Sequence, residues 1–264
     1  MTRVSVLMGI YNCAPYLEEA LNSLMGQTFQ DFKIILCEDG STDDTYRVAK
    51  AYAEKCDKII LIRNDRNRGL NYTLNRCLEL ADTEYCARMD GDDISLPTRF
   101  EKEVKFLDEH PDYAIVTTPM KHFDETGVYK TGVGGFEPKL SDFPKYSPFC
   151  HAPCMVRTEA YKAVGGYTVA DNLLREEDYH LWIKMYQKGY RGYTIKEPLY
   201  MMRDDRNAAK RRNFKARKNE SYVKHLAIKM LHLPFYYHIY CLKPLVLGIM
   251  PNWLYNFLYK LKSK

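Results

Sequence analysis

Short apolar runs alternate with stretches of helical spacing through the first third of the chain, and this alternation constrains the fold more than any other feature. The runs have the length of buried strands, and they are Val4–Ile10, Lys33–Cys37, Lys58–Arg63 and Tyr85–Met89. The stretches between them have the apolar spacing of helices, and they are Pro15–Met25, Thr45–Lys55 and Asn71–Ala81. This alternation predicts an α/β fold built on a mostly parallel, Rossmann-like sheet with flanking helices.

The loops that follow the expected strands define the candidate site. In open parallel sheets, ligands bind beyond the carboxyl ends of the strands. The loops at that edge are Tyr11–Pro15, Glu38–Asp43, Asn64–Gly69 and Asp90–Asp93. We therefore expect these four loops to share one rim and to form the active site.

Beyond Pro97 the pattern is less regular, and the charge changes towards the end. We expect a helix over Thr98–Glu109, a strand over Tyr113–Thr118 and a glycine-rich loop over Gly127–Gly135. A second helix is expected over Glu177–Lys188. Residues 203–264 contain 14 basic residues (Lys and Arg) and 3 acidic ones (Asp and Glu), so this part is strongly basic. Residues 1–202 contain 25 basic and 31 acidic residues and are therefore acidic overall. We therefore divide the chain into a domain over residues 1–218 and a basic, aromatic, amphipathic helical tail over residues 219–264.

Three carboxylates stand on one expected turn, in Asp90-Gly91-Asp92-Asp93. Carboxylate oxygens suit Mg²⁺ or Mn²⁺, which also take water and substrate phosphate oxygens as ligands. Two acids separated by one residue point to the same side of an extended segment. The alternative is a solvated turn, with Asp93 as the N-cap of the next helix.

Asp39 ends the second expected strand, where its carboxylate can accept hydrogen bonds from a ribose or a base edge. A dinucleotide fold would need G-x-G-x-x-G after the first strand, and residues 9–15 lack those glycines. The site can therefore hold a nucleotide, but not through the glycine-rich pyrophosphate turn of a dinucleotide-binding fold. Tyr11 can stack on a base, although a partly buried loop aromatic explains this residue equally well.

Glu177 and Asp178 open the expected helix over Glu177–Lys188. An acid at a helix N-terminus is stabilised by the helix dipole, so we expect Asp178 to be ionised. A structural role at the helix start is one interpretation. The other is a general base that takes a proton from an acceptor hydroxyl.

Taken together, these motifs resemble family 2 glycosyltransferases of the GT-A fold, particularly those of bacterial capsule and exopolysaccharide synthesis. The resemblance covers roughly residues 3–218, and its motifs are VSVLMGIYN, EDGSTDDT, ARMDGDDISLPTRFEKEV, HAPCMVR and EEDYHLW. It implies a GT-A domain that transfers a sugar from a nucleotide-sugar donor, with a UDP-sugar favoured. The acceptor would be a hydroxyl of a polysaccharide or a lipid-linked sugar.

The resemblance also implies roles for single residues. Tyr11 and Asp39 would hold the nucleobase, while Asp90 and Asp92 would bind Mn²⁺ or Mg²⁺ and the diphosphate. Asp178 would be the catalytic base, with Glu177 as the second choice.

Three further positions complete the comparison with the family. His151 would approach the metal or the acceptor, with a core histidine as the alternative, and Arg203 would lie near the phosphates. Many relatives carry Asp where this chain has His180, which indicates a different acceptor side.

The family mechanism is a single displacement that inverts the anomeric carbon, with a nucleoside diphosphate as leaving group. A nucleotidyltransferase could use the same carboxylates, but the chain has no glycine-rich or lysine-bearing phosphate loop after its first strand. A catalytically idle GT-A fold that binds or regulates is the remaining alternative. The retention of Asp90, Asp92 and Asp178 argues against it.

The tail suggests where the protein works. Its apolar stretches are interrupted by Pro234, Pro244 and Pro251, so none reaches the roughly 20 residues of a spanning helix. Tyrosines, Trp253 and lysines suit the headgroup boundary of an anionic membrane. We expect a peripheral protein on the inner face of the cell membrane, without nucleic acid, and an oligomer is possible. The alternative is that the tail packs on the catalytic domain or on a second subunit.

The eight cysteines agree with a cytoplasmic location. They form no Cys-x-x-Cys pair and no zinc-binding pattern with histidines, so we expect reduced thiols in the core. No signal peptide precedes the expected strand at Val4.

Overall fold

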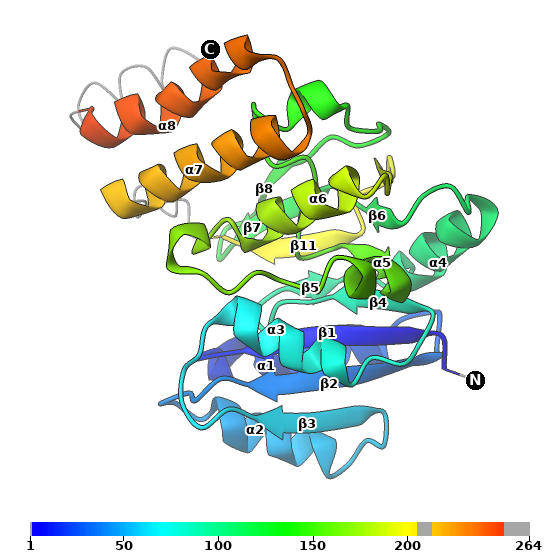
Figure 1. The fold of residues 1–264 in the computed structure, drawn as a ribbon. Coiled ribbons are helices and arrows are strands. Elements are labelled where there is room, and N and C mark those ends of the chain that lie inside the picture. The colour runs from blue at the N-terminus through cyan, green and yellow to red at the C-terminus, as the bar shows by residue number, and fades with distance from the viewer. Residues whose placement is uncertain (1, 205–212, 251–264) are drawn as a thin grey trace.

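The predicted alternation of strands and helices is present in the computed structural model, which describes residues 2–204 and 213–250 (Figure 1). Four strands pair in parallel in the order β3-β2-β1-β4, and they are β1 (Val4–Ile10), β2 (Phe32–Glu38), β3 (Ile59–Arg63) and β4 (Tyr85–Arg88). The helices between them are α1 (Ala14–Met25), α2 (Thr45–Ala53) and α3 (Leu70–Glu79). The parallel register places the ends of all four strands at one edge of the sheet.

Three later strands extend this sheet beyond β4, and they are β9 (Met155–Arg157), β6 (Ile115–Thr117) and β10 (Gly192–Thr194). Only β9 runs antiparallel to its neighbours within the seven strands. The helices of this half are α4 (Arg99–Glu109), α5 (Thr158–Ala163) and α6 (Glu177–Gln187), with short 3-10 turns η1 (Leu140–Asp142) and η2 (Asp171–Leu173). The mostly parallel α/β fold is confirmed.

A second, four-stranded sheet lies beside the first. Its order is β5 (Ile94–Ser95), β11 (Tyr200–Arg203), β7 (Met120–Asp124) and β8 (Gly127–Thr131). The prediction of a glycine-rich loop over Gly127–Gly135 is therefore wrong for its first half. Residues 127–131 carry Val, Tyr and Thr, which favour strands, and they pair antiparallel with β7. Pairing of β11 with β5 brings Arg203 next to the acidic turn.

Helices cover both faces of the large sheet, because side chains alternate along each strand. In β1, Val4, Val6 and Met8 pack with α1 and α4 on one face, and Leu7 packs with α3 and α6 on the other. The cysteines are free thiols, and six of the eight are buried, as the composition predicts.

The chain ends, within its described part, in two stacked helices. They are α7 (Phe214–Met230) and α8 (Ile239–Ile249), joined through the 3-10 turn η4 (Phe235–His238). Figure 1 shows α7 lying over α6 and α8 lying over α7. Val223, Ala227 and Leu231 of this region belong to the same core as α6. The proposed boundary after residue 218 thus falls inside one continuous helix, whose inner face completes the core.

No helix among residues 2–204 and 213–250 is long and apolar enough to cross a membrane. The expectations for residues 251–264, including Trp253, lie outside the described residues.

Candidate active site

The carboxyl ends of β1 and β2 enclose a small cavity at the predicted rim. Its volume is about 170 Å³, and it is lined by Gly9, Ile10, Tyr11, Asp39, Asn67, Gly69, Leu70 and Thr73. Tyr11 is 45% exposed at its mouth, whereas Asp39 is buried. The structure therefore brings the two predicted nucleobase residues to one cavity.

Asp39 organises the wall of this cavity. Its Oδ1 accepts hydrogen bonds from Asn64 Nδ2 at 2.6 Å and from the Arg68 backbone N–H at 2.8 Å, and its Oδ2 accepts from the Gly69 N–H at 2.9 Å. Gly40 has a φ of 70°, and a Cβ there would lie 2.5 Å from the Arg66 carbonyl carbon. The loop over residues 64–69 is thus held against β2 at both places.

The acidic turn after β4 rests on a buried guanidinium. Arg88 is fully buried and donates to Asp90 Oδ1 and to the backbone carbonyl of Met89. The Asp90 N–H donates to the Tyr200 hydroxyl at 3.2 Å. These contacts with the buried Arg88 and with Tyr200 hold both the side chain and the backbone of Asp90 in place.

Gly91 lets the acidic turn approach the first loop. A Cβ at this position would lie 2.7 Å from Cys13 Sγ and 3.0 Å from Ile10 Cγ2. Because Ile10 also lines the small cavity, the acidic turn and the cavity share a wall. The predicted rim is therefore one continuous site.

Asp92 is the second acid of this turn, and its carboxyl has a raised pKa. Burial, and then the charge of Asp90, raise the pKa of the Asp92 carboxyl, while Arg88 and Arg203 oppose the shift. Two carboxylates held close together repel each other, and a divalent cation relieves that repulsion. Mg²⁺ and Mn²⁺ are bound by one or two carboxylates together with substrate phosphates, so this donor set fits either ion.

Arg203 closes the other side of the acidic turn. Its Nε donates to the Asp92 carbonyl at 3.0 Å, and its backbone N–H donates to Asp93 Oδ1 at 2.8 Å. The expected N-cap role of Asp93 is therefore wrong, because the next helix, α4, has Thr98 at its N-cap position. The Arg203 guanidinium also pairs with Glu19, and its contact with a phosphate stays a prediction.

Glu177 and Asp178 lie in the first turn of α6, as predicted. Burial, and then the charge of Glu177, raise the pKa of Asp178 to about 7, against backbone hydrogen bonds and the charge of Arg88. Burial also raises the pKa of Glu177, and Asp90 contributes to that shift. The expectation of a fully ionised Asp178 is corrected here, because desolvation outweighs the helix dipole.

His151 faces a tyrosine. Its Nε2 lies 2.8 Å from the Tyr167 hydroxyl, and burial followed by the charge of Arg88 holds its pKa well below the usual range. Within residues 2–204 and 213–250, no three His, Cys, Asp or Glu residues gather as a metal-binding group. His151 therefore lies beside Tyr167, and its approach to a metal or an acceptor stays a prediction.

Comparison with known proteins now identifies the chain. The profile of the family described as glycosyl transferase family 2 matches residues 5–165. The putative glycosyltransferase EpsE of Bacillus subtilis is 42% identical over 250 residues, which are 94% of this chain and 90% of that protein. The chain belongs to glycosyl transferase family 2.

Other similarities agree with this family. The amylovoran biosynthesis glycosyltransferase AmsE of Erwinia amylovora is 28% identical, over 98% of this chain and 99% of that protein. The crystal structure of S. aureus TarS 1-349 in complex with UDP-GlcNAc matches with a TM-score of 0.72 and 20% identity, over 94% of this chain and 71% of that one. This glycosyltransferase thus has the GT-A fold expected from its motifs.

The structure adds residues to the site that sequence reasoning missed. Arg88 lies under Asp90, and Arg99 donates to the Arg88 carbonyl at 2.7 Å while pairing with buried Glu103 at 3.1 Å. Tyr200 reaches Asp90 from β11. The available signal was a charged residue, Arg88, inside the apolar run Tyr85–Met89 and two residues before Asp90.

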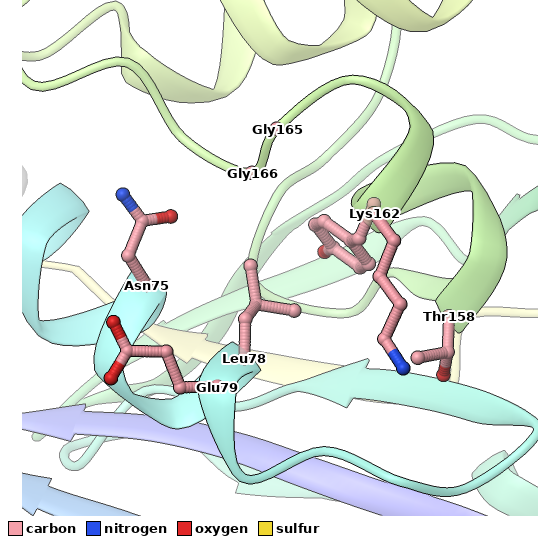
Figure 2. A pocket seen from close by; sticks show the side chains of 8 residues that line it. Asn75, Leu78, Glu79, Thr158, Lys162, Gly165 and Gly166 are labelled. Atoms are coloured by element: carbon pink, nitrogen blue, oxygen red, sulfur yellow. The ribbon is translucent and has the colours of Figure 1, made fainter.

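The glycosyltransferase also has a larger cavity, of about 420 Å³, between α3 and α5 (Figure 2). None of the predicted site residues lines this cavity. Its Asn75 amide is bonded at both ends to the Tyr167 backbone, each at 2.8 Å, so this side chain ties two segments together. Of these two cavities, only the smaller one at the strand ends is lined by predicted site residues, Tyr11 and Asp39.

Proposed function

We propose that this glycosyltransferase moves a sugar from a nucleotide-sugar to an acceptor hydroxyl with inversion at the anomeric carbon. The observation that carries this proposal is the shared rim, where the Asp39 cavity and the Asp90–Asp93 turn meet through Ile10 and Gly91. One part is suited to a nucleoside and the other to a diphosphate. The paired acids at the start of α6 supply a base.

The donor would bind along this rim, and we favour a UDP-sugar. Tyr11 would stack on the base, and Asp39, already bound to the 64–69 loop, would present its remaining lone pairs to the base or ribose. Arg203 would pair with the diphosphate, because its guanidinium lies against the Asp92 carbonyl.

Asp90 and Asp92 would hold Mn²⁺ or Mg²⁺ together with diphosphate oxygens. The ion, when bound, neutralises the negative charge that grows on the departing diphosphate. Arg88 keeps one Asp90 oxygen engaged, which leaves the other oxygen free to act as a ligand in a fixed orientation.

Asp178 would accept the proton of the acceptor hydroxyl as its oxygen attacks the anomeric carbon. The new C–O bond forms on the face opposite the diphosphate, and the bond to the diphosphate oxygen breaks. A pKa of about 7 lets Asp178 act as a base near neutral pH and still hold the proton after transfer. Glu177 remains the second candidate for the base.

We propose a cell-surface polysaccharide as the product and a growing polysaccharide or lipid-linked sugar as the acceptor, at the cytoplasmic face of the membrane. The similarity to a relative named for amylovoran biosynthesis supports this role. So does a 26% identical relative named as a UDP-Glc:alpha-D-GlcNAc-diphosphoundecaprenol beta-1,3-glucosyltransferase.

A thermal-shift panel of nucleotide-sugars with and without Mn²⁺ tests the donor assignment. A ligand that binds only the native state raises the midpoint of unfolding. We expect one nucleotide-sugar, with its nucleoside diphosphate, to raise it in the presence of Mn²⁺. Stabilisation by nucleoside triphosphates and by no nucleotide-sugar would contradict the proposal and favour a nucleotidyltransferase.

A further inference from the structure

The outer face of η4 and α8 carries an apolar stripe that the described residues leave open to solvent. Five side chains between 51% and 83% exposed form it, and they are Phe235, Ile239, Leu242, Val246 and Ile249. The four in α8 are spaced three and four residues apart, so they share one face of the helix. A contiguous row of this kind on a surface marks an interaction site.

Packing against α7 determines where this stripe points. Cys241 and Pro244 are buried on the inner face of α8. A Cβ at Gly248 would lie 2.7 Å from the Phe214 ring, and Ser221 Oγ donates to the Cys241 carbonyl at 2.8 Å. The stripe therefore faces outward because α7 holds the opposite side, as the stacking in Figure 1 shows.

The charge of this end of the chain indicates what covers the stripe. Residues 221–264 contain six lysines and not one Asp or Glu. Lys243 is exposed beside the stripe, and Tyr236 is exposed where the stripe begins. Lysine with aromatic and aliphatic side chains is the composition that binds the headgroup boundary of an anionic membrane.

We propose that the face of α8 formed by Ile239, Leu242, Val246 and Ile249 docks on an anionic lipid surface, with Lys243 at the headgroups. Insertion of one helix face to the depth of the acyl boundary needs no more than this stripe. A stable protein dimer would bury about 800 Å² and 20–30 residues on each partner, which a single row of five side chains does not supply. The absence of acidic residues in 221–264 also gives a second copy no opposite charge at this face.

The docking goes beyond the proposed function, because it assigns a lipid-binding role to a surface that lies apart from the donor rim. In Figure 1, α8 lies at the opposite end of the molecule from β1, β2 and β3, with α7 and α6 between them. The docking does not rest on the proposed function.

Co-flotation of the full chain with phosphatidylcholine vesicles, with or without phosphatidylglycerol, tests the docking. We expect binding to the anionic vesicles at low salt and much weaker binding at high salt, because lysine attraction is screened. The variant Leu242→Glu with Val246→Glu should lose roughly tenfold or more of the binding, since it puts charges into the acyl boundary. Both positions are exposed, so the variant should keep the wild-type unfolding midpoint.

Val169→Glu is the matched control, because Val169 is 56% exposed and lies outside the stripe. It should float as the wild type does. Flotation of the double variant as strong as that of the wild type would overturn the proposal, and so would absence of the wild type from both kinds of vesicle. A wild-type dimer that the double variant converts to a monomer, without vesicle binding, would assign the stripe to a second copy instead.

These outcomes are independent of catalysis. Failure of flotation together with donor binding in the thermal-shift panel would remove the docking and leave the transferase. Flotation without donor binding would leave the docking and contradict the proposed function.

Discussion

The guanidinium of Arg88 lies buried beneath Asp90 and donates to its carboxylate, so a charge inside the core orients the first acid of the proposed diphosphate site. Removing one partner of a buried ion pair is destabilising, because it leaves the other charge uncompensated. Arg88 is therefore a positioning residue whose charge also acts on Asp178, the pKa of which it lowers against burial.

Substitution of Arg88 tests this arrangement through the pH profile. Arg88→Met should move the acidic limb of kcat/KM to higher pH, because Asp178 loses a favourable charge. Arg88→Lys keeps the charge and should restore the position of that limb. An unchanged limb in a folded Arg88→Met protein would limit Arg88 to a structural role.

Asp92→Asn should lower turnover about a hundredfold, as losses of charge-stabilising groups do. The unfolding midpoint should stay near that of the wild type. Activity titrated with Mn²⁺ should show weaker metal dependence in the variant, while Asp82→Asn, at an exposed surface acid, should behave as wild type. Full turnover of Asp92→Asn in excess chelator would contradict the metal assignment.

Asp178→Asn should abolish sugar transfer and leave nucleotide-sugar binding nearly unchanged, because the residue acts on the acceptor proton. Calorimetric donor binding and product formation measure the two properties separately. Should Glu177→Gln abolish transfer while Asp178→Asn does not, the base is Glu177.

The pKa of about 7 at Asp178 predicts a pH dependence of both activity and stability. Activity needs the ionised form, so kcat/KM should fall about tenfold per pH unit well below pH 7. The folded-state pKa lies above the unfolded value near 3.9, so ionisation of Asp178 lowers the free energy of unfolding as the pH rises from about 4 to 7.

Asp178→Asn removes the ionisable carboxyl and therefore the loss of stability that its ionisation causes. It should raise Tm at pH 8 by a few degrees, since ~1 kcal/mol shifts Tm by about 2–4 °C in a protein of this size. It should have little effect at pH 4, where wild-type Asp178 is protonated. Equal Tm differences at the two pH values would argue against a buried, ionising carboxyl.

Gly91→Ala tests the contact between the acidic turn and the first loop. The added methyl group would meet Cys13 Sγ at 2.7 Å, so the turn must shift and transfer should drop. Cys13→Ala in the same chain removes that sulfur and should restore part of the activity. Wild-type kinetics for Gly91→Ala alone would show that the turn tolerates displacement.

The order of strands and helices in the first third could be predicted because each element there carries its own periodicity. The acids at 90, 92, 177 and 178 could be placed because each follows a strand or opens a helix. The contacts that orient them could not, since Tyr200 and Arg203 come from a strand more than a hundred residues further along the chain. The expectation that Asp93 caps the next helix failed for the same reason, because the Asp93 carboxylate instead accepts a hydrogen bond from the distant Arg203 backbone N–H.

The burial of side chains explains the remaining differences between the sequence-based expectations and the structure. The helix start predicts an ionised Asp178, but local sequence carries no information on how far neighbouring segments exclude water. Arg88, likewise, reads from the sequence as the solvated end of a strand, and only the assembled core shows that it is enclosed.

The hydrogen bonds at Asp39 have a thermodynamic consequence for donor recognition. They anchor the 64–69 loop within the folded protein, so the entropy of ordering that loop is lost during folding and not during association. Nucleotide binding should then occur as a nearly rigid encounter, with a small heat-capacity change that reflects the buried surface alone. The affinity for the sugar nucleotide would then not be reduced by the cost of ordering this loop.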